Sequence, residues 1–186
     1  MSVQYQKRYF NVAEYYRMAE AGVLSPDDRV ELIEGEIIEM SPIGSRHAAC
    51  VRRVDAFLNR QIGNLAQVSV QSPVRLNDFS EPQPDIALLK SRDDFYATAH
   101  PTPADVLLII EVTDTSVEYD RGIKLPLYAR AGIPQVLIVN MPSEVIENYS
   151  EPANGAYQKF MRVQRGESID ILLLPTISLP IDVVFG

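Results

Sequence analysis

The segment Asp105-Val-Leu-Leu-Ile-Ile-Glu-Val112 decides the fold class. Its apolar run from Val106 to Ile110 has no polar alternation, which is typical of a central strand buried on both faces. Helical spacing from about Ser116 to Ala131, ended by Gly132, predicts a helix, and Pro134 opens a second apolar strand to Val139. Strand, helix and strand in this order predict a right-handed crossover at the heart of a sheet.

Further elements are expected on both sides of this crossover, from helical spacing and from apolar runs bounded by turn residues. Before it, the sequence predicts helices from Val12 to Ala21 and from Ser45 to Ile62, a hairpin from Val30 to Met40 around Glu34-Gly35, and strands from Ala66 to Gln71 and from Pro84 to Lys90. Ser45 is the expected helix cap. After the crossover, strands at Val145 to Tyr149, Tyr157 to Val163 and Ile169 to Leu174 are typical of an antiparallel meander.

Length and composition favour one mixed α/β domain over residues 1–186. The 186 residues are 46% hydrophobic and 23% charged, which supports one sizeable core. The single Cys50 cannot form an internal disulfide, and the N-terminus has no apolar signal segment. No apolar run is long enough to span a membrane. We therefore expect a soluble, cytoplasmic protein without a membrane partner.

The net charge of −8 argues against a protein that binds nucleic acid chiefly through a basic surface. One stretch of the sequence nevertheless gathers several basic residues, namely Arg46, Arg52, Arg53 and Arg60. The stretch fits a local phosphate-binding patch, and it fits a solvated helix face better. Charge alone therefore weakens a nucleic-acid function without excluding it.

Two carboxylates mark a candidate metal site. Asp85 starts one strand and Glu111 lies near the end of the buried strand, 26 positions later. Antiparallel pairing of the two runs would bring both carboxylates to one edge of the sheet, where oxygen ligands suit a hard cation. Glu111 is the stronger candidate, because a charge at the end of an apolar run is costly to bury without a partner.

The following helix places three polar side chains on one face. Asp120, Lys124 and Tyr128 are successive i+4 positions, and Lys124 can reach the metal site if the start of the helix faces the strand ends. Pro126 removes a helical hydrogen bond and leaves the placement of Lys124 open. A simple helical salt bridge between Asp120 and Lys124 is the structural alternative. His47 lies in the first turn of its helix and fits a polar residue near a helix start better than a ligand.

Three separated motifs resemble the Uma-two family of restriction endonucleases. They are Ile110-Glu-Val-Thr-Asp-Thr-Ser-Val-Glu-Tyr-Asp-Arg-Gly-Ile-Lys-Leu-Pro-Leu-Tyr-Ala-Arg-Ala-Gly-Ile-Pro134, Glu31-Leu-Ile-Glu-Gly-Glu-Ile-Ile38 and Gln83-Pro-Asp-Ile86. With Ser45-Arg-His47 between them, the resemblance covers about residues 10–150 and keeps the order of the motifs. It implies the PD-(D/E)xK nuclease superfamily, and with it a restriction-endonuclease-like mixed β-sheet core flanked by helices.

The resemblance implies a function and a site. Asp85 and Glu111 would hold a metal with the carbonyl of Val112, and Lys124 would be the catalytic cation. The usual motif has its lysine two residues after the glutamate, where this sequence has Thr113, so Lys124 would stand in for it. Glu31 or Glu36, between which the sequence does not choose, would supply an additional acid. His47, Thr113, Asp120 and Tyr128 are further candidates for supporting roles. The family's usual glutamate, tryptophan and aspartate after Pro134 are replaced by Gln135, Leu137 and Asn140.

We therefore expect a Mg²⁺-dependent endonuclease that hydrolyses DNA, with Mn²⁺ as a substitute, because the ligands are hard oxygens. A degenerate member that binds nucleic acid or a protein partner without cleaving is the first alternative. A carboxylate-based hydrolase of small molecules would explain the acidity but has no motif behind it. A homodimer is a further hypothesis, with the C-terminal strands as its interface.

Overall fold

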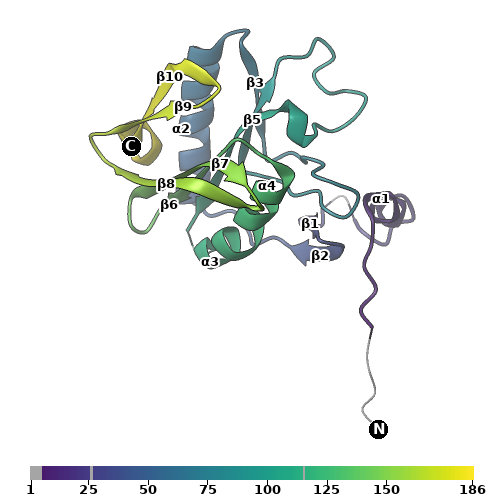
Figure 1. Cartoon of the computed structure of the whole chain (residues 1–186). Helices are drawn as coiled ribbons and strands as arrows, with labels where there is room; N and C mark the ends of the chain where they lie inside the picture. The colour runs from purple at the N-terminus through teal and green to yellow at the C-terminus, as the bar shows by residue number, and fades with distance from the viewer. Residues whose placement is uncertain (1–5, 26, 115) are drawn as a thin grey trace.

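A six-stranded mixed sheet forms the centre of the computed structural model, which describes residues 6–25, 27–114 and 116–186. The strand order is β3-β4-β5-β6-β7-β8 (Figure 1). The strands are β3 (Ala66–Val70), β4 (Ile86–Lys90), β5 (Val106–Thr113), β6 (Gln135–Asn140), β7 (Val145–Ala153) and β8 (Ala156–Gln164). The mixed α/β class predicted from the sequence is thus confirmed.

Strand β5 occupies the interior of this sheet, as its unbroken apolar run predicts. All eight of its residues are buried. It pairs antiparallel with β4 and parallel with β6, and its parallel partner follows in the chain after the helical segment. Helices cover both sides of a sheet built with such crossovers, so its central strand is buried on both faces and is apolar throughout.

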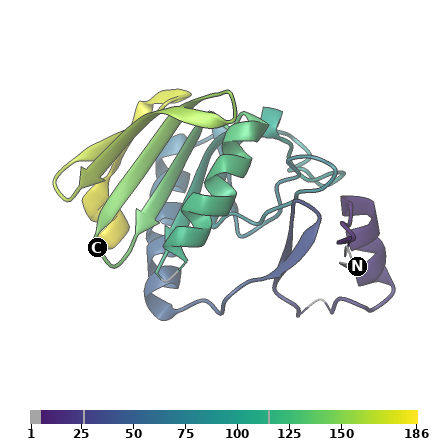
Figure 2. The same cartoon turned by 60° about the horizontal axis from the view of Figure 1, so that its bottom comes forward.

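Each face of the sheet has its own helical cover (Figure 2). Helix α2 (Ser45–Ile62) packs on one face through a stripe of Cys50, Val54 and Leu58, which are all 0% exposed. Helix α5 (Ile181–Phe185) and the ribbon of β9 (Ser168–Ile171) and β10 (Leu174–Pro180) complete this core. On the other face lies α4 (Leu125–Ala131), with Leu127 and Tyr128 buried against the sheet.

The N-terminal part forms an extension beside the sheet (Figure 2). It comprises α1 (Val12–Glu20) and a hairpin of β1 (Val30–Ile33) and β2 (Glu36–Glu39), the hairpin predicted from the sequence. Gly35 has φ +81°, and a Cβ there would lie 2.6 Å from the Cβ of Tyr9, so the turn needs glycine. The hairpin is tied to the segment before β4, where the Glu81 N–H donates to the Leu32 carbonyl at 2.7 Å.

The helix predicted from about Ser116 to Ala131 is divided into three pieces. A short α3 (Val117–Tyr119) leads into a π-helical turn, η2 (Asp120–Lys124), which continues into α4. The Leu125 N–H donates to the carbonyl of Asp120, five residues back. Pro126 has no N–H to donate to the carbonyl four residues back, so the regular α-helical hydrogen-bond pattern cannot continue through it. The wider π-helical turn before it accommodates this interruption.

Two other expectations need correction. Ser45 does not cap α2; Gly44 occupies the N-cap position and Ser45 is the first helical residue. The last predicted strand, Ile169 to Leu174, ends at Ile171 as β9; it pairs with β10, which begins at Leu174 and continues beyond the predicted range, instead of extending the main sheet. The first two members of the antiparallel meander, β7 and β8, do lie in the main sheet.

Gln135 joins the sheet to the C-terminal ribbon. Its amide donates to Asn148 Oδ1 at 3.0 Å and to the Asp170 carbonyl at 3.1 Å, and its Oε1 accepts from the Leu172 N–H at 2.9 Å. The departure from the family pattern at this position therefore has a structural role. Among the described residues, no helix is long and apolar enough to cross a membrane.

Candidate active site

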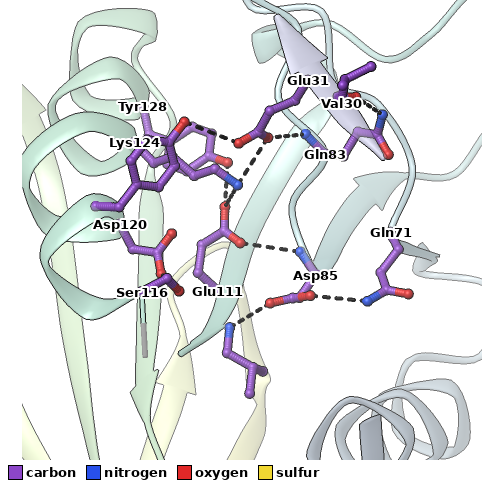
Figure 3. A network of polar contacts seen from close by, with 12 residues as sticks. Val30, Glu31, Gln71, Gln83, Asp85, Glu111, Ser116, Asp120, Lys124 and Tyr128 are labelled. Carbon is purple, nitrogen blue, oxygen red and sulfur yellow. Dashed lines mark hydrogen bonds and ion pairs between the residues drawn. The ribbon is translucent and has the colours of Figure 1, made fainter. Parts of the chain in front are cut away.

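A pocket of about 420 Å³ lies where the end of β5 meets three other parts of the chain. Its walls come from the β1–β2 hairpin, the segment that leads into α2, and the α3–η2 turn. In Figure 3, the side chains of Glu31 from the hairpin and Lys124 from the η2 turn point toward Glu111 on β5. Five residues predicted from the sequence to act together line it, namely Asp85, Glu111, Val112, Asp120 and Lys124.

Asp85 lies beside Glu111 because of the strand register. Ile86 pairs with Ile110, so the next residues of the antiparallel strands are Asp85 and Glu111. The Val112 N–H donates to Asp85 Oδ2 at 2.8 Å, and the Asp85 N–H is 3.3 Å from Glu111 Oε2. The antiparallel arrangement expected from the sequence therefore brings both carboxylates to one edge of the sheet.

His47 reaches the same carboxylate from the first turn of α2. Its Nε2 lies 2.8 Å from Asp85 Oδ1, and both side chains are largely buried. The hydrogen bond to Asp85 raises the pKa of His47, while burial opposes the rise. Gln71 also donates to Asp85 Oδ1, at 3.2 Å (Figure 3). Asp85 is thus held from three sides.

Glu111 is a buried carboxylate that shares the ammonium of Lys124 with Glu31. It is 4% exposed, accepts a hydrogen bond of 2.6 Å from the Tyr128 hydroxyl, and lies 3.3 Å from the Lys124 ammonium. Burial raises the pKa of Glu111 to about 8, and the carboxylates of Asp120 and Asp85 add to the rise although Lys124 opposes it. The protein therefore holds this carboxylate in an environment that favours an additional cation.

Lys124 lies between two glutamates. Its Nζ is 3.1 Å from Glu31 Oε2 and 3.3 Å from Glu111 Oε1, and its side chain is 7% exposed. Burial would lower the pKa of Lys124, but Glu111, Glu31 and Asp120 outweigh burial and the net shift is upward. The ammonium is therefore charged and directed at the carboxylates, in the position that the sequence left open.

The structure separates the two hairpin glutamates between which the sequence could not choose. Glu31 is 1% exposed, binds Lys124, and accepts from the Gln83 N–H at 3.1 Å and the Tyr119 hydroxyl at 3.3 Å. Glu36 lies outside the pocket lining and pairs with the exposed Lys7 at 2.7 Å. Only Glu31 therefore joins the candidate site.

Asp120 and Thr113 also differ in their placement. Asp120 lines the pocket and accepts a hydrogen bond of 2.9 Å from the Ser116 hydroxyl; burial raises its pKa although Lys124 opposes the rise. Thr113 is 0% exposed and absent from the lining, and its carbonyl accepts from the Met141 N–H. The position that normally carries the motif lysine is therefore buried outside the lining, with its hydroxyl 3.4 Å from that of the pocket residue Ser116.

Several pocket residues were not predicted from the sequence. Gln83 and Tyr119 lie within the family motifs but carry no charge that would single them out, and Arg29 and Asp114 lie in loops. Gln71 has φ +46°, a conformation that non-glycine residues adopt rarely and that often marks a functional site. This signal exists only in the folded backbone.

The donor set fits a hard divalent cation with few protein ligands. Asp85 and Glu111 supply carboxylate oxygens. In an extended strand the N–H and C=O of one residue point the same way, so the Val112 carbonyl lies on the side of Asp85. In the described part of the chain, no three His, Cys, Asp or Glu side chains form a ready-made metal site. Mg²⁺ commonly uses one or two carboxylates and keeps several waters, so two carboxylates and a carbonyl suffice.

The predicted basic patch does not act as a unit. Arg53 donates twice to the Val184 carbonyl, at 3.1 and 2.8 Å, and so ties α2 to α5. Arg46, Arg52 and Arg60 are exposed and do not line the pocket. The interpretation of this stretch as a largely solvated helix face agrees with the structure.

Comparisons with known proteins agree with this architecture. A family model, Uma2, described as "Putative restriction endonuclease", matches residues 12–182. The fold is similar to the crystal structure of "a putative nuclease belonging to DUF820" from Anabaena variabilis ATCC 29413. That similarity has a TM-score of 0.75 at 14% identity and covers 95% of this chain and 97% of that one. No functionally curated protein matches this chain.

Proposed function

The chain belongs to the Uma2 restriction-endonuclease family, and from this premise we propose that it is a metal-dependent endonuclease that hydrolyses DNA phosphodiester bonds. Family membership supports nuclease activity in general. Mg²⁺ as the metal, DNA as the substrate and the roles of individual residues are the proposal.

One observation carries the proposal: Asp85, Glu111 and Lys124 come from a strand start, a central strand and a helical turn, and they converge in one pocket. A divalent ion held by Asp85, Glu111 and the Val112 carbonyl would polarise the phosphodiester and lower the pKa of a bound water. Lys124 places a fixed positive charge beside the position where the phosphoryl group gains negative charge.

The surrounding side chains orient these three groups. The Tyr128 hydroxyl fixes one oxygen of Glu111, and His47 and Gln71 fix one oxygen of Asp85. Glu31 holds Lys124 in the pocket by its ion pair. Such preorganisation means that little reorganisation is needed when the reaction creates charge.

A degenerate, non-cleaving family member is the second candidate. The pocket lining carries six carboxylates, which repel phosphate unless a cation neutralises them. Divalent metal binding separates the two candidates. A chain that binds Mg²⁺ or Mn²⁺ through Asp85 and Glu111 can offset this charge, whereas a chain that binds neither cannot cleave by the proposed route.

The test is cleavage of plasmid and oligonucleotide DNA in Mg²⁺ or Mn²⁺ by the native chain and by Asp85→Asn, Glu111→Gln and Lys124→Met. Glu36→Gln is the matched control, because Glu36 shares the hairpin with Glu31 but lies outside the pocket. We expect metal-dependent cutting that the three pocket variants lose and the control keeps. Circular dichroism checks the folding of each variant.

Two outcomes would contradict the proposal. Equal cutting by native chain and pocket variants would place the activity elsewhere or in a contaminant. No cutting by the native chain, together with no metal binding in calorimetry, would favour the non-cleaving candidate.

Assembly and location are further proposals. Strand β8 forms one edge of the main sheet, so a homodimer could extend the sheet there; sedimentation of the native chain tests this. The single cysteine is buried and unpaired, which suits a reducing cytoplasm. A fluorescent fusion tests the location.

A further inference from the structure

We propose that the pocket receives one unpaired nucleotide at a time, so that the enzyme acts on single-stranded or frayed DNA in preference to intact duplex. This inference rests on the proposed nuclease function and adds the class of DNA substrate. Three features of the pocket carry it: its depth and size, its mixture of polar groups with apolar and aromatic side chains, and its charge.

The pocket is small and its candidate reacting groups are deep. Its volume of about 420 Å³ lies in the range of about 300–1,000 Å³ that encloses one small ligand. Glu111 is 4% exposed and Lys124 6%, so a scissile phosphate must enter the pocket to reach them. A phosphate in a stacked, paired duplex is fixed to its neighbours, whereas an unpaired nucleotide is free to turn inward.

The lining offers groups for both halves of a nucleotide. Asp85, Glu111 and Lys124 mark the place where a phosphate and its cation would lie. Strand β2 and the segment after it add the apolar side chains of Ile38, Met40 and Ile43 to the lining, interspersed with Glu39 and Ser41. Tyr119 also lines the pocket, and its hydroxyl donates to Glu31. Its ring offers a stacking surface for a base that no longer stacks on its neighbours.

The charge of the pocket disfavours a duplex. Among the residues that the structure describes, six carboxylates line the pocket, with Arg29 and Lys124 as the Arg or Lys residues. Arg29 Nη1 already donates to the Ser41 carbonyl at 2.7 Å. Duplex DNA carries one negative charge per about 1.7 Å of its axis, and proteins that grip it neutralise many phosphates. A site with two cations and a net charge of −8 in the whole chain suits a substrate that presents few phosphates at once.

The first experiment compares substrates of one sequence in Mg²⁺ and in Mn²⁺. They are a single-stranded oligonucleotide, the same strand in a blunt duplex, and the duplex with an unpaired flap. We expect the single strand and the flap to be cut at least tenfold faster than the blunt duplex. Equal or faster cutting of the blunt duplex would overturn this inference and leave the nuclease proposal intact. No cutting of any substrate would refute both.

The second experiment tests the base-stacking surface by combining enzyme and substrate changes. Tyr119→Ala removes the ring, whereas Tyr119→Phe keeps the ring and removes only the bond to Glu31. The substrate is single-stranded DNA with or without an abasic residue at the cut site. If the ring stacks the base, Tyr119→Ala raises KM about tenfold on the intact strand and little on the abasic strand.

Tyr119→Phe separates the ring from the hydroxyl: because it keeps the stacking surface, its KM on the intact strand should rise less than that of Tyr119→Ala. Equal effects of Tyr119→Ala on intact and abasic strands would show that the ring supports the pocket without touching a base, and would overturn this part of the inference. An equal rise in KM for Tyr119→Phe and Tyr119→Ala would assign the effect to the lost hydrogen bond with Glu31, and would likewise overturn this part of the inference.

Discussion

Two buried glutamates, Glu111 on β5 and Glu147 on β7, are 4% and 2% exposed, yet they lie in opposite electrostatic environments. Glu147 forms a bidentate salt bridge with Arg121, whose Nη2 and Nε donate to its two carboxylate oxygens at 2.6 and 2.8 Å. It also accepts a hydrogen bond of 2.9 Å from the Tyr149 hydroxyl. Burial opposes ionisation, but these partners outweigh it and lower the pKa of Glu147. Burial raises the pKa of Glu111 to about 8.

The difference separates a stabilising ion pair from a candidate cation site. Glu147 has Arg121 and, at 3.4 Å, Arg162 as cationic partners, so its charge is matched. Glu111 shares the single ammonium of Lys124 with Glu31. Perturbed carboxylates with incomplete charge compensation are characteristic of functional sites. A similar degree of burial therefore has opposite consequences in the two regions.

The largest expected effect comes from removing the shared ammonium. Lys124→Met leaves Glu31 and Glu111 buried without their cation, and we expect a loss of about 3–5 kcal/mol in the free energy of unfolding. Arg121→Met is the matched change, and it should cost about 1–2 kcal/mol because Glu147 keeps Arg162 and Tyr149. Urea denaturation without divalent metal measures both, and equal losses would break the comparison.

Replacing each glutamate by glutamine, which has nearly the same shape, tests whether only Glu111 is needed for catalysis. Glu111→Gln should lower kcat of DNA cleavage about 100- to 1,000-fold, because it removes a proposed metal ligand from the pocket. Glu147→Gln should retain the native kcat, since this residue does not line the pocket, and should instead lower the free energy of unfolding by about 1–3 kcal/mol. A similar loss of kcat in both variants would remove the functional distinction.

Divalent metal should stabilise only one of the two regions. At a Mg²⁺ or Mn²⁺ concentration of about 100 Kd, binding to the folded state adds about 2.7 kcal/mol to the free energy of unfolding. Thermal unfolding with and without the metal measures this gain. We expect it in the native chain and in Glu147→Gln but not in Glu111→Gln. A full gain in Glu111→Gln would place the metal away from β5.

The most gradual effects are opposite pH dependences of stability without metal, each at most about 1.4 kcal/mol per pH unit. The Glu111 pKa is raised from its ordinary 4.5 to about 8, so its stabilising contribution is present below pH 4.5 and lost as pH rises to about 8. The Glu147 pKa is lowered, so its contribution is present above pH 4.5 and lost in acid.

Urea denaturation across pH tests both slopes. Glu111→Gln should flatten the decline between pH 4.5 and 8, and Glu147→Gln should flatten the decline below pH 4.5. Unchanged slopes in either variant would show that other groups control that part of the profile.

Much of this site was predictable because its groups are fixed by chain pattern. The apolar run before Glu111 predicted a buried strand, and antiparallel pairing with the strand after Asp85 predicted that the two carboxylates meet. The i+4 spacing predicted that Lys124 and Tyr128 share a helix face, and both contact Glu111. Periodicity and register are local properties, so the sequence carries them directly.

Other features depend on contacts between distant segments. The choice of Glu31 over Glu36 depends on how the hairpin docks on residues 79–83. The break after Ile171, which separates β9 from β10, accompanies the Leu172 N–H bond to Gln135, 37 residues away. The local sequence pattern of neither segment specifies these contacts. In the hairpin, for example, alternation of apolar and acidic residues does not say which face packs against the rest of the protein.

The sequence by itself determined the mixed α/β core, the strand that carries Glu111 and the helix face that carries Lys124. Only the tertiary structure decided that Lys124 would be shared by Glu31 and Glu111 while Glu147 gained its own arginines. The physical reason is that charge compensation in a protein interior depends on distances of a few ångströms between side chains far apart in the sequence. Such distances are set when the hairpin, the sheet and the π-turn pack together.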